Sequence, residues 1–307
     1  MRWRAGTVVR SIPAAALVLA AGLALAAQEP ARAQSAQAAG EHVDVALVLA
    51  IDVSRSMSRD ELAIQRRGYA EAIASREVLQ AIDYGPHGRI GLAIFEWAGD
   101  FHARELLPWT IIESEADAQA VAARLLEGES IGQSRTSISG ALLRGMALLE
   151  AVPYQAERRV IDVSGDGPNN QGQPVTGLRD AAVDRGITIN GLPLMTSDGF
   201  AQYFGISDLD EYYRRCVIGG PGAFVVPVHE WTEFPEAVRR KLVMEIGGLA
   251  PPDDPRRDPW LDLWQHPLQD ARPPVVPAQF AAAEPYDCLV GEKMWRNRRD
   301  LFYDGGR

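Results

Sequence analysis

Three short segments of the chain end in oxygen-bearing side chains that could bind a metal ion. An Asp-x-Ser-x-Ser run directly follows the apolar run at residues 43–51, a threonine opens a helical pattern near residue 136, and an Asp-Gly pair follows the apolar run at residues 159–164. None of the three contributes a sulfur or an imidazole. Oxygen ligands of this kind suit a hard ion, Mg²⁺ first, with Mn²⁺ or Ca²⁺ as alternatives. The candidate ligands are Asp52, Ser54, Ser56, Thr136 and Asp166.

The elements that must position these residues alternate between strand-like and helix-like patterns. Apolar runs predict strands at residues 43–51, 89–97, 101–112, 159–164, 187–195 and 223–228. Helical spacing or capping signals predict helices at residues 58–82, 115–127, 137–151, 178–185, 209–217 and 232–248. Such alternation is typical of an α/β sandwich with a mainly parallel sheet. The three-residue link at 98–100 predicts a hairpin, and so one antiparallel strand at an edge.

This arrangement places the candidate ligands at one end of the sheet. In open α/β sheets, ligands bind beyond the carboxyl ends of the strands, where the strand order reverses. Asp52 and Asp166 each follow a predicted strand. The helix that starts after Ser58 directs its partially positive N-terminus at this end, and the two carboxylates offset the repulsion of a cation. The hydroxyl ligands add no charge, so the ion is expected to attract an acidic ligand from outside.

The three segments together resemble the metal-ion-dependent adhesion site of von Willebrand factor A-like domains. The resemblance covers residues 43–248 and implies a Rossmann-like three-layer α/β sandwich. It also implies that Ser54, Ser56 and Thr136 contact the metal, that Asp52 and Asp166 act through water, and that an Asp or Glu of a protein partner completes the shell. The third segment departs from the family's Thr-Asp-Gly, because Asp166 follows Gly165. Asp162, earlier in the same strand, is a rival that we interpret as a hydrogen-bonded strand residue.

The stretch at residues 214–224, together with the start of the chain, further resembles an uncharacterised exported bacterial branch of these domains, for which no function is established. Residues 1–33 show basic residues, an apolar run and an Ala-Arg-Ala exit, which predict a secretory signal peptide. An uncleaved anchor is the alternative, although the run is short of the ~20 apolar residues that span a membrane. We therefore expect a periplasmic or secreted protein with no membrane span after signal removal.

The remaining segments complete the predicted organisation. Residues 34–42 form a short linker, residues 43–248 the domain, and the proline-rich residues 249–307 an extended tail.

The chain has a net charge of −10, and losing residues 1–33, with four Arg and one Glu, would leave −13. This acidity argues against a nucleic-acid partner. Cys216 and Cys288 are the only two cysteines, and an oxidising compartment permits a bond between them, although sequence does not show that they meet.

The sequence leaves three classes of function to weigh. We expect a protein–protein interaction domain rather than an enzyme, because no His or Glu is placed near the ligand segments as a base, and no G-x-S-x-G elbow occurs. A metal-assisted hydrolase remains the enzymatic alternative. A structural envelope protein, whose metal only stabilises the fold, is the third reading. The five histidines show no metal-ligand spacing, so no zinc site is expected from them.

Overall fold

The computed structural model describes residues 41–100, 102–196, 205–248 and 286–304. The predicted signal peptide and most of the predicted linker lie outside these residues, as does the proline-rich stretch up to residue 285. Within the described part of the chain, no helix is long and apolar enough to cross a membrane.

The centre of the domain is a five-stranded sheet with the order β3-β2-β1-β4-β5. Neighbouring strands pair in parallel except β3, which is antiparallel to β2 and lies at the edge. This confirms the predicted mainly parallel sheet with one antiparallel edge strand. The strands are β1 (His42–Asp52), β2 (Ile90–Trp97), β3 (Ala103–Ile112), β4 (Gln155–Gly165) and β5 (Ile187–Pro193).

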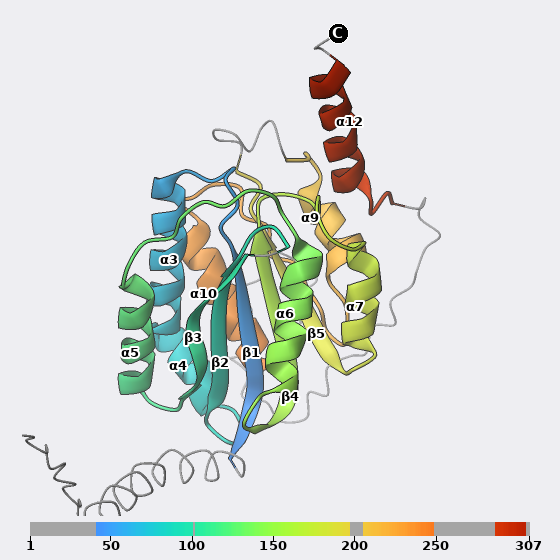
Figure 1. Ribbon diagram of the computed structural model, residues 1–307. Coiled ribbons are helices and arrows are strands. Elements are labelled where there is room, and N and C mark those ends of the chain that lie inside the picture. The colour runs from blue at the N-terminus through green and yellow to red at the C-terminus, as the bar shows by residue number, and fades with distance from the viewer. Residues whose placement is uncertain (1–40, 101, 197–204, 249–285, 305–307) are drawn as a thin grey trace, which may run out of the picture. The chain divides into compact units, whose positions relative to one another are not determined.

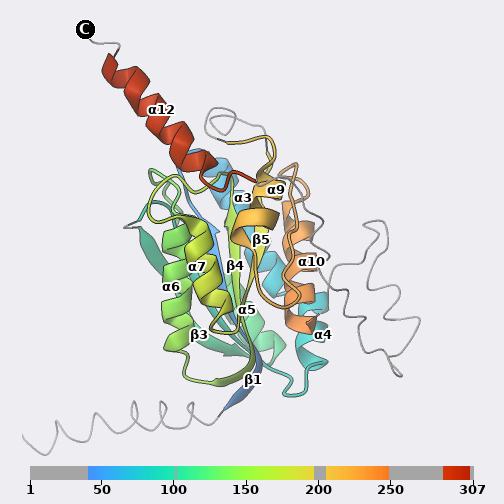
Figure 2. The ribbon, with the colours of Figure 1, turned by 90° about the vertical axis from the view of Figure 1, so that its right-hand side faces the viewer.

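Strand β1 is central because both of its faces are apolar. Leu47 and Leu49 point into one hydrophobic core, whereas Ala46 and Val48 point into the other. Helices cover both faces, which gives the three-layer α/β architecture that the family resemblance implies (Figure 1, Figure 2). One layer comprises α3 (Arg59–Ile73), α4 (Arg76–Asp83), α5 (Glu115–Leu126) and α10 (Phe234–Gly247); the other comprises α6 (Ile138–Glu150), α7 (Val175–Val183), α9 (Leu209–Tyr212) and the π-helical η1 (Tyr213–Val217).

Several predicted elements differ from the observed ones. The helix expected at 58–82 is two helices, because Ser75 caps a second one by accepting a hydrogen bond from the Val78 amide. The strand expected at 223–228 forms only isolated bridges beside β5, where Pro227 lacks a backbone donor. The expected extended tail contains a helix, α12 (Val290–Asp304).

A buried ionic cluster joins the sheet to α10. Lys241, 1% exposed, places its Nζ 2.6 Å from Asp162 Oδ1 and also pairs with Glu245. Asn190 Nδ2 donates to Glu245 Oε1 at 2.9 Å. Asp162, the rival metal ligand, is thus engaged inside the core rather than at the end of the strand. Burial, together with the nearby Asp162 carboxylate, raises the pKa of Glu245 to about 7.

The raised pKa of Glu245 predicts a pH-dependent stability. The unfolded carboxyl titrates near ~4.3, so the folded protein binds more protons between that pH and about 7, and the free energy of unfolding falls as pH rises through this window. Glu245→Gln keeps a carbonyl acceptor for Asn190 and Lys241 but cannot ionise. We expect urea unfolding at pH 5–8 to show a smaller decline for this variant. The exposed Glu236→Gln on the same helix is the control; an unchanged decline in Glu245→Gln would contradict the prediction.

Candidate metal centre

The hydroxyl of Ser54 lies between two buried carboxylates at the carboxyl ends of β1 and β4. Ser54 Oγ is 3.1 Å from Asp52 Oδ2, 3.0 Å from Asp166 Oδ1 and 2.9 Å from Ser56 Oγ. The Ser54 amide also donates to Asp52 Oδ1 at 2.7 Å. β1 and β4 are adjacent parallel strands, so their ends meet at the point where the strand order reverses. The structure therefore brings four of the five predicted ligands together.

Thr136 lines a pocket together with Ser54 and Ser56. The pocket has a volume of about 360 Å³ and contains Ser54, Ser56 and Thr136 in its wall. The Thr136 amide donates to Asn170 Oδ1 at 3.0 Å, and the Asn170 amide donates to the Thr136 carbonyl at 2.8 Å. These bonds attach the threonine loop to the segment after Asp166. Among the described residues, those that line the pocket are Ser54, Arg55, Ser56, Ser134, Arg135, Thr136, Asn170 and Trp295.

The two carboxylates are short of positive partners. Burial, and secondly the charge of Asp166, raises the pKa of Asp52 well above its usual value, and burial likewise raises the pKa of Asp166. A serine hydroxyl carries one proton, so Ser54 cannot donate to both at once. Asp166 Oδ2 is buried without a hydrogen-bond partner in the part of the chain that the structure describes. A divalent cation held by Ser54, Ser56 and Thr136 would supply the missing charge, so the donor set fits a hard ion.

Backbone geometry brings these groups close together. A Cβ added to Gly165 would lie 2.9 Å from Asp52 Oδ2, so glycine lets β4 approach the β1 carboxylate. Arg135, directly before Thr136, has φ 77° and is the single non-glycine residue with positive φ in the described segments. Left-handed backbone is costly for an arginine, and such strain persists where the surrounding structure imposes it.

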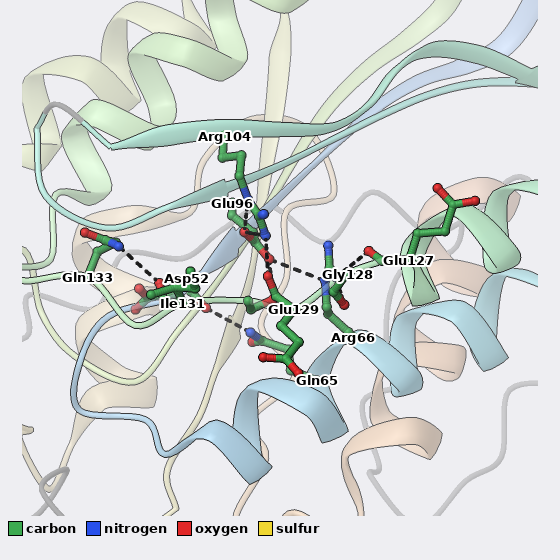
Figure 3. A network of polar contacts seen from close by, with 11 residues as sticks. Asp52, Gln65, Arg66, Glu96, Arg104, Glu127, Gly128, Glu129, Ile131 and Gln133 are labelled. Atoms are coloured by element: carbon green, nitrogen blue, oxygen red, sulfur yellow. Dashed lines mark hydrogen bonds and ion pairs between the residues drawn. The ribbon is translucent and has the colours of Figure 1, made fainter.

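A buried ionic network holds the loop that leads to Thr136 (Figure 3). Glu96, 1% exposed at the end of β2, pairs with Arg104 Nε at 2.8 Å and with Arg66 Nε at 3.5 Å. The two arginines then donate to backbone carbonyls of the loop. Arg66 Nη1 bonds the carbonyls of residues 127 and 128 at 2.9 and 2.8 Å, and Arg104 Nη2 bonds that of residue 129 at 3.1 Å. Through the two arginines, the Glu96 carboxylate thus fixes the positions of three loop carbonyls.

The same loop pairs directly with the Asp-x-Ser-x-Ser segment. The Gln133 amide donates to the Val53 carbonyl at 2.8 Å, and the Arg55 amide donates to the Gln133 carbonyl at 2.7 Å. Gln65 Nε2 donates to the Asp52 carbonyl at 2.8 Å from helix α3 (Figure 3). The metal-site loops are therefore held by backbone pairing and by a buried amide, independently of any ion.

Helix α12 forms part of the pocket although it comes from the end of the chain. A disulfide joins Cys216 in η1 to Cys288, with 5.6 Å between their Cα atoms. Asn169 Nδ2 donates to Glu292 Oε1 at 2.8 Å. The guanidinium of Arg135 lies 3.9 Å from the ring centroid of Trp295, a cation–π contact. The disulfide thus tethers a helix whose tryptophan lines the wall beside Thr136.

Sequence reasoning missed these supporting residues. Glu96 is a charged residue within an apolar strand, and this was the one local signal that an oppositely charged side chain must pair with it. Arg66, Arg104 and Trp295 come from distant parts of the chain and showed no pattern that links them to the site.

A family model matches residues 42–250, the whole domain that carries the site, and its description is "Protein of unknown function (DUF1194)". The chain belongs to the DUF1194 family. The comparison with curated proteins found no match for this DUF1194 protein.

Solved structures similar to the DUF1194 chain include a protein of the mussel byssus and a bacterial pilus adhesin. Proximal thread matrix protein 1 from the mussel byssus is 13% identical, with a TM-score of 0.47 over 67% of this chain and 49% of that chain. The pilus adhesin SpaC from Lactobacillus rhamnosus GG, in its open conformation, is 12% identical, with a TM-score of 0.48 over 66% of this chain and 30% of that chain. Another structure of the mussel protein has a zinc-occupied MIDAS motif, at 13% identity and a TM-score of 0.46 over 67% of this chain and 48% of that chain. The DUF1194 chain therefore spans half or less of the length of these proteins.

The Glu96 network predicts a loss of metal affinity without any change of ligand. In the DUF1194 protein, Glu96→Gln removes the charge that holds Arg66 and Arg104, so the loop before Thr136 should loosen. We expect Mn²⁺ affinity, measured by calorimetry, to fall by about tenfold, as for other supporting residues of metal sites. Glu105→Gln, which removes an exposed pair with Arg144, should leave the affinity unchanged. Equal affinities in wild type and Glu96→Gln would rule out this role.

The disulfide predicts redox-dependent docking of α12. Reduction removes the covalent tether and leaves α12 to its non-covalent contacts, among them the Glu292–Asn169 bond and the Arg135–Trp295 contact. We expect amide hydrogen exchange at residues 289–297 to accelerate by about tenfold or more on reduction. The Cys216→Ser/Cys288→Ser double variant should match reduced wild type and should not respond to reductant. Unchanged protection after reduction would show that the helix docks without its tether.

Proposed function

We propose that this DUF1194 protein binds an acidic side chain of a protein partner through a divalent cation, Mg²⁺ or Mn²⁺ in its place. The observation that carries the proposal is the arrangement around Ser54. One hydroxyl lies between the buried carboxylates of Asp52 and Asp166, in the wall of a pocket that also contains Ser56 and Thr136. Ser54, Ser56 and Thr136 would hold the ion, with Asp52 and Asp166 behind them.

The charges around the pocket favour an acidic ligand. The two ionised carboxylates would balance the two charges of the cation. Arg55 and Arg135 also line the pocket and add positive charge that the described carboxylates there do not offset. Trp295 adds an aromatic wall that can contact the apolar stem of a ligand. A Glu or Asp of the partner would then meet a positively charged pocket with an ion at its base.

Binding is favoured over the two alternatives by the composition of the pocket wall. Its described lining residues offer hydroxyls, guanidinium groups, an amide and an indole, whereas the hydrolase reading needs a base placed to activate water. Asp52 and Asp166 are buried beside Ser54, and neither is among the described residues that line the pocket. The reading of a purely stabilising metal requires a closed site. A pocket of about 360 Å³ beside the hydroxyls instead leaves room for an external ligand.

We further propose that the protein acts in the periplasm or outside the cell. The disulfide between Cys216 and Cys288 is of the kind that persists in oxidising compartments. The basic and apolar residues 1–33 fit a signal peptide that directs the chain there.

Ligand substitutions test the ion site. Asp52→Ala and Thr136→Ala should each abolish calorimetric binding of Mg²⁺ and Mn²⁺, because they remove a charge or a ligand oxygen. Ser58→Ala is the matched control. Ser58 caps α3 through Glu61, so its loss should cost about 1 kcal/mol of stability and leave metal binding intact. Metal binding that survives Asp52→Ala would refute the assignment of the site.

A carboxylate probe tests the ligand class separately. Mn²⁺ bound with an open coordination position enhances the relaxation of water protons. Glutarate should lower this enhancement by displacing the water, whereas the equally sized neutral glutaramide should not. Mn²⁺ binding without a glutarate effect would support a purely stabilising ion and would contradict recognition of an acidic group.

A further inference from the structure

A second cluster of metal-ligating side chains lies at the opposite end of β1. His42 is the first residue of β1, Glu157 lies on β4, and His87 belongs to the loop between α4 and β2. One ligand atom from each of the three lies within 4.8 Å of the other two. The imidazole rings of His42 and His87 stack with centroids 5.4 Å apart, and His87 Nε2 is 3.1 Å from Glu157 Oε1. The spacing of histidines along the chain predicted no such cluster, because its members come from three separate elements.

The strand register directs two of the three side chains to one face. His42 is paired with Gln155 across β1 and β4, and Glu157 is two residues further along β4. Residues two apart point to the same face of a sheet, so His42 and Glu157 share that face. Their positions depend on the pairing of the two central strands and not on a flexible segment.

The loop that presents His87 is fixed by a buried carboxylate. Asp44, 4% exposed, accepts hydrogen bonds from the amides of His87 at 2.9 Å and Arg89 at 3.3 Å. The Asp44 amide donates back to the Arg89 carbonyl at 2.9 Å. Gly88 adopts φ +62°, a conformation that glycine tolerates and that closes this turn. The backbone of His87 is therefore held in place before any ligand binds.

We propose that His42, His87 and Glu157 form a binding site for a Zn²⁺-class transition-metal ion. Two imidazole nitrogens and one carboxylate suit Zn²⁺, Ni²⁺ or Cu²⁺, whereas Mg²⁺ and Ca²⁺ require oxygen ligands. Ligand atoms around a tetrahedral Zn²⁺ lie about 3.3 Å apart, so the His87–Glu157 pair is already at that spacing. The exposed His42 ring has to approach by about 1.5 Å at most. Three protein ligands leave a fourth position for water or for an outside group.

This site is distinct in place and in chemistry from the one at Asp52. The two lie at opposite ends of an 11-residue strand, roughly 30 Å apart at ~3.3 Å per residue. A bound ion would link the start of β1 to β4 and to the loop before β2. It would therefore stabilise this end of the two central strands, because a ligand that binds only the folded state raises the unfolding temperature.

Calorimetric titration of the tag-free protein with ZnCl₂, in excess Mg²⁺, tests the proposal. We expect one Zn²⁺ per chain with a dissociation constant in the micromolar range. His87→Ala should weaken binding at least ~10-fold, as loss of one of three ligands requires. Asp52→Ala should retain it, which separates this site from the proposed function. His229→Ala replaces an exposed histidine outside the cluster and is the matched control.

Two further readouts keep the test decisive. Zn²⁺ should raise the midpoint of thermal unfolding of wild type but not of His87→Ala, and His87→Gln serves if the alanine variant misfolds. The Cu²⁺ electron paramagnetic resonance spectrum should show coupling to two nitrogens in wild type and to one in His42→Ala. Zn²⁺ affinity that is unchanged in the His87 variants, or weaker than millimolar in wild type, would overturn the proposal.

Discussion

Two carboxylates of like charge are buried on either side of one serine hydroxyl, and the rest of the site is arranged around that constraint. Asp52 and Asp166 are brought together because β1 and β4 are neighbouring parallel strands whose carboxyl ends coincide. Burial disfavours both charges, and the Ser54 hydroxyl can donate a hydrogen bond to only one of the two carboxylates at a time. A divalent cation would resolve this conflict, and the neighbouring hydroxyls of Ser56 and Thr136 would offer it ligands without adding negative charge.

The position of the third ligand loop depends on a second buried charge. Glu96 lies at the end of β2, where it engages Arg66 and Arg104, and these arginines hold the carbonyls of the loop before Thr136 (Figure 3). Removing one member of such a network would leave the others buried and unpaired. The strained backbone of Arg135 lies at the end of this loop. The Glu96 network and the positive φ of Arg135 together position Thr136 beside the pocket without a bound ion.

The local parts of this architecture could be predicted from the sequence. The apolar run before Asp52, the capping box at Ser58 and the hairpin link before β3 each predicted their element, because each signal lies within one turn or one strand. Asp166 was predicted to lie beyond the strand end, and Asp162 to be a hydrogen-bonded strand residue; the structure places Asp166 directly after β4 and pairs Asp162 with Lys241. The break at Ser75, whose side chain caps the second helix, was missed.

Contacts between distant segments could not be predicted in this way. Trp295 reaches the pocket from a helix that the Cys216–Cys288 disulfide joins to η1, and local periodicity does not show where a segment after residue 249 will dock. The pairing of Arg66 with Glu96 and the meeting of His42 with His87 likewise depend on the packing of separate elements. Sequence patterns therefore predicted the candidate ligands, four of which the structure brings together, but not the residues that support them or that come from α12 to line the pocket.

The most direct test of the central claim is an anomalous diffraction measurement on crystals of the protein grown with Mn²⁺. The account predicts one peak within ligand distance of Ser54, Ser56 and Thr136, with at least one coordination position occupied by solvent or by a carboxylate from outside the chain. A well-ordered pocket without a Mn²⁺ peak, or an ion enclosed entirely by this chain's own groups, would contradict the account.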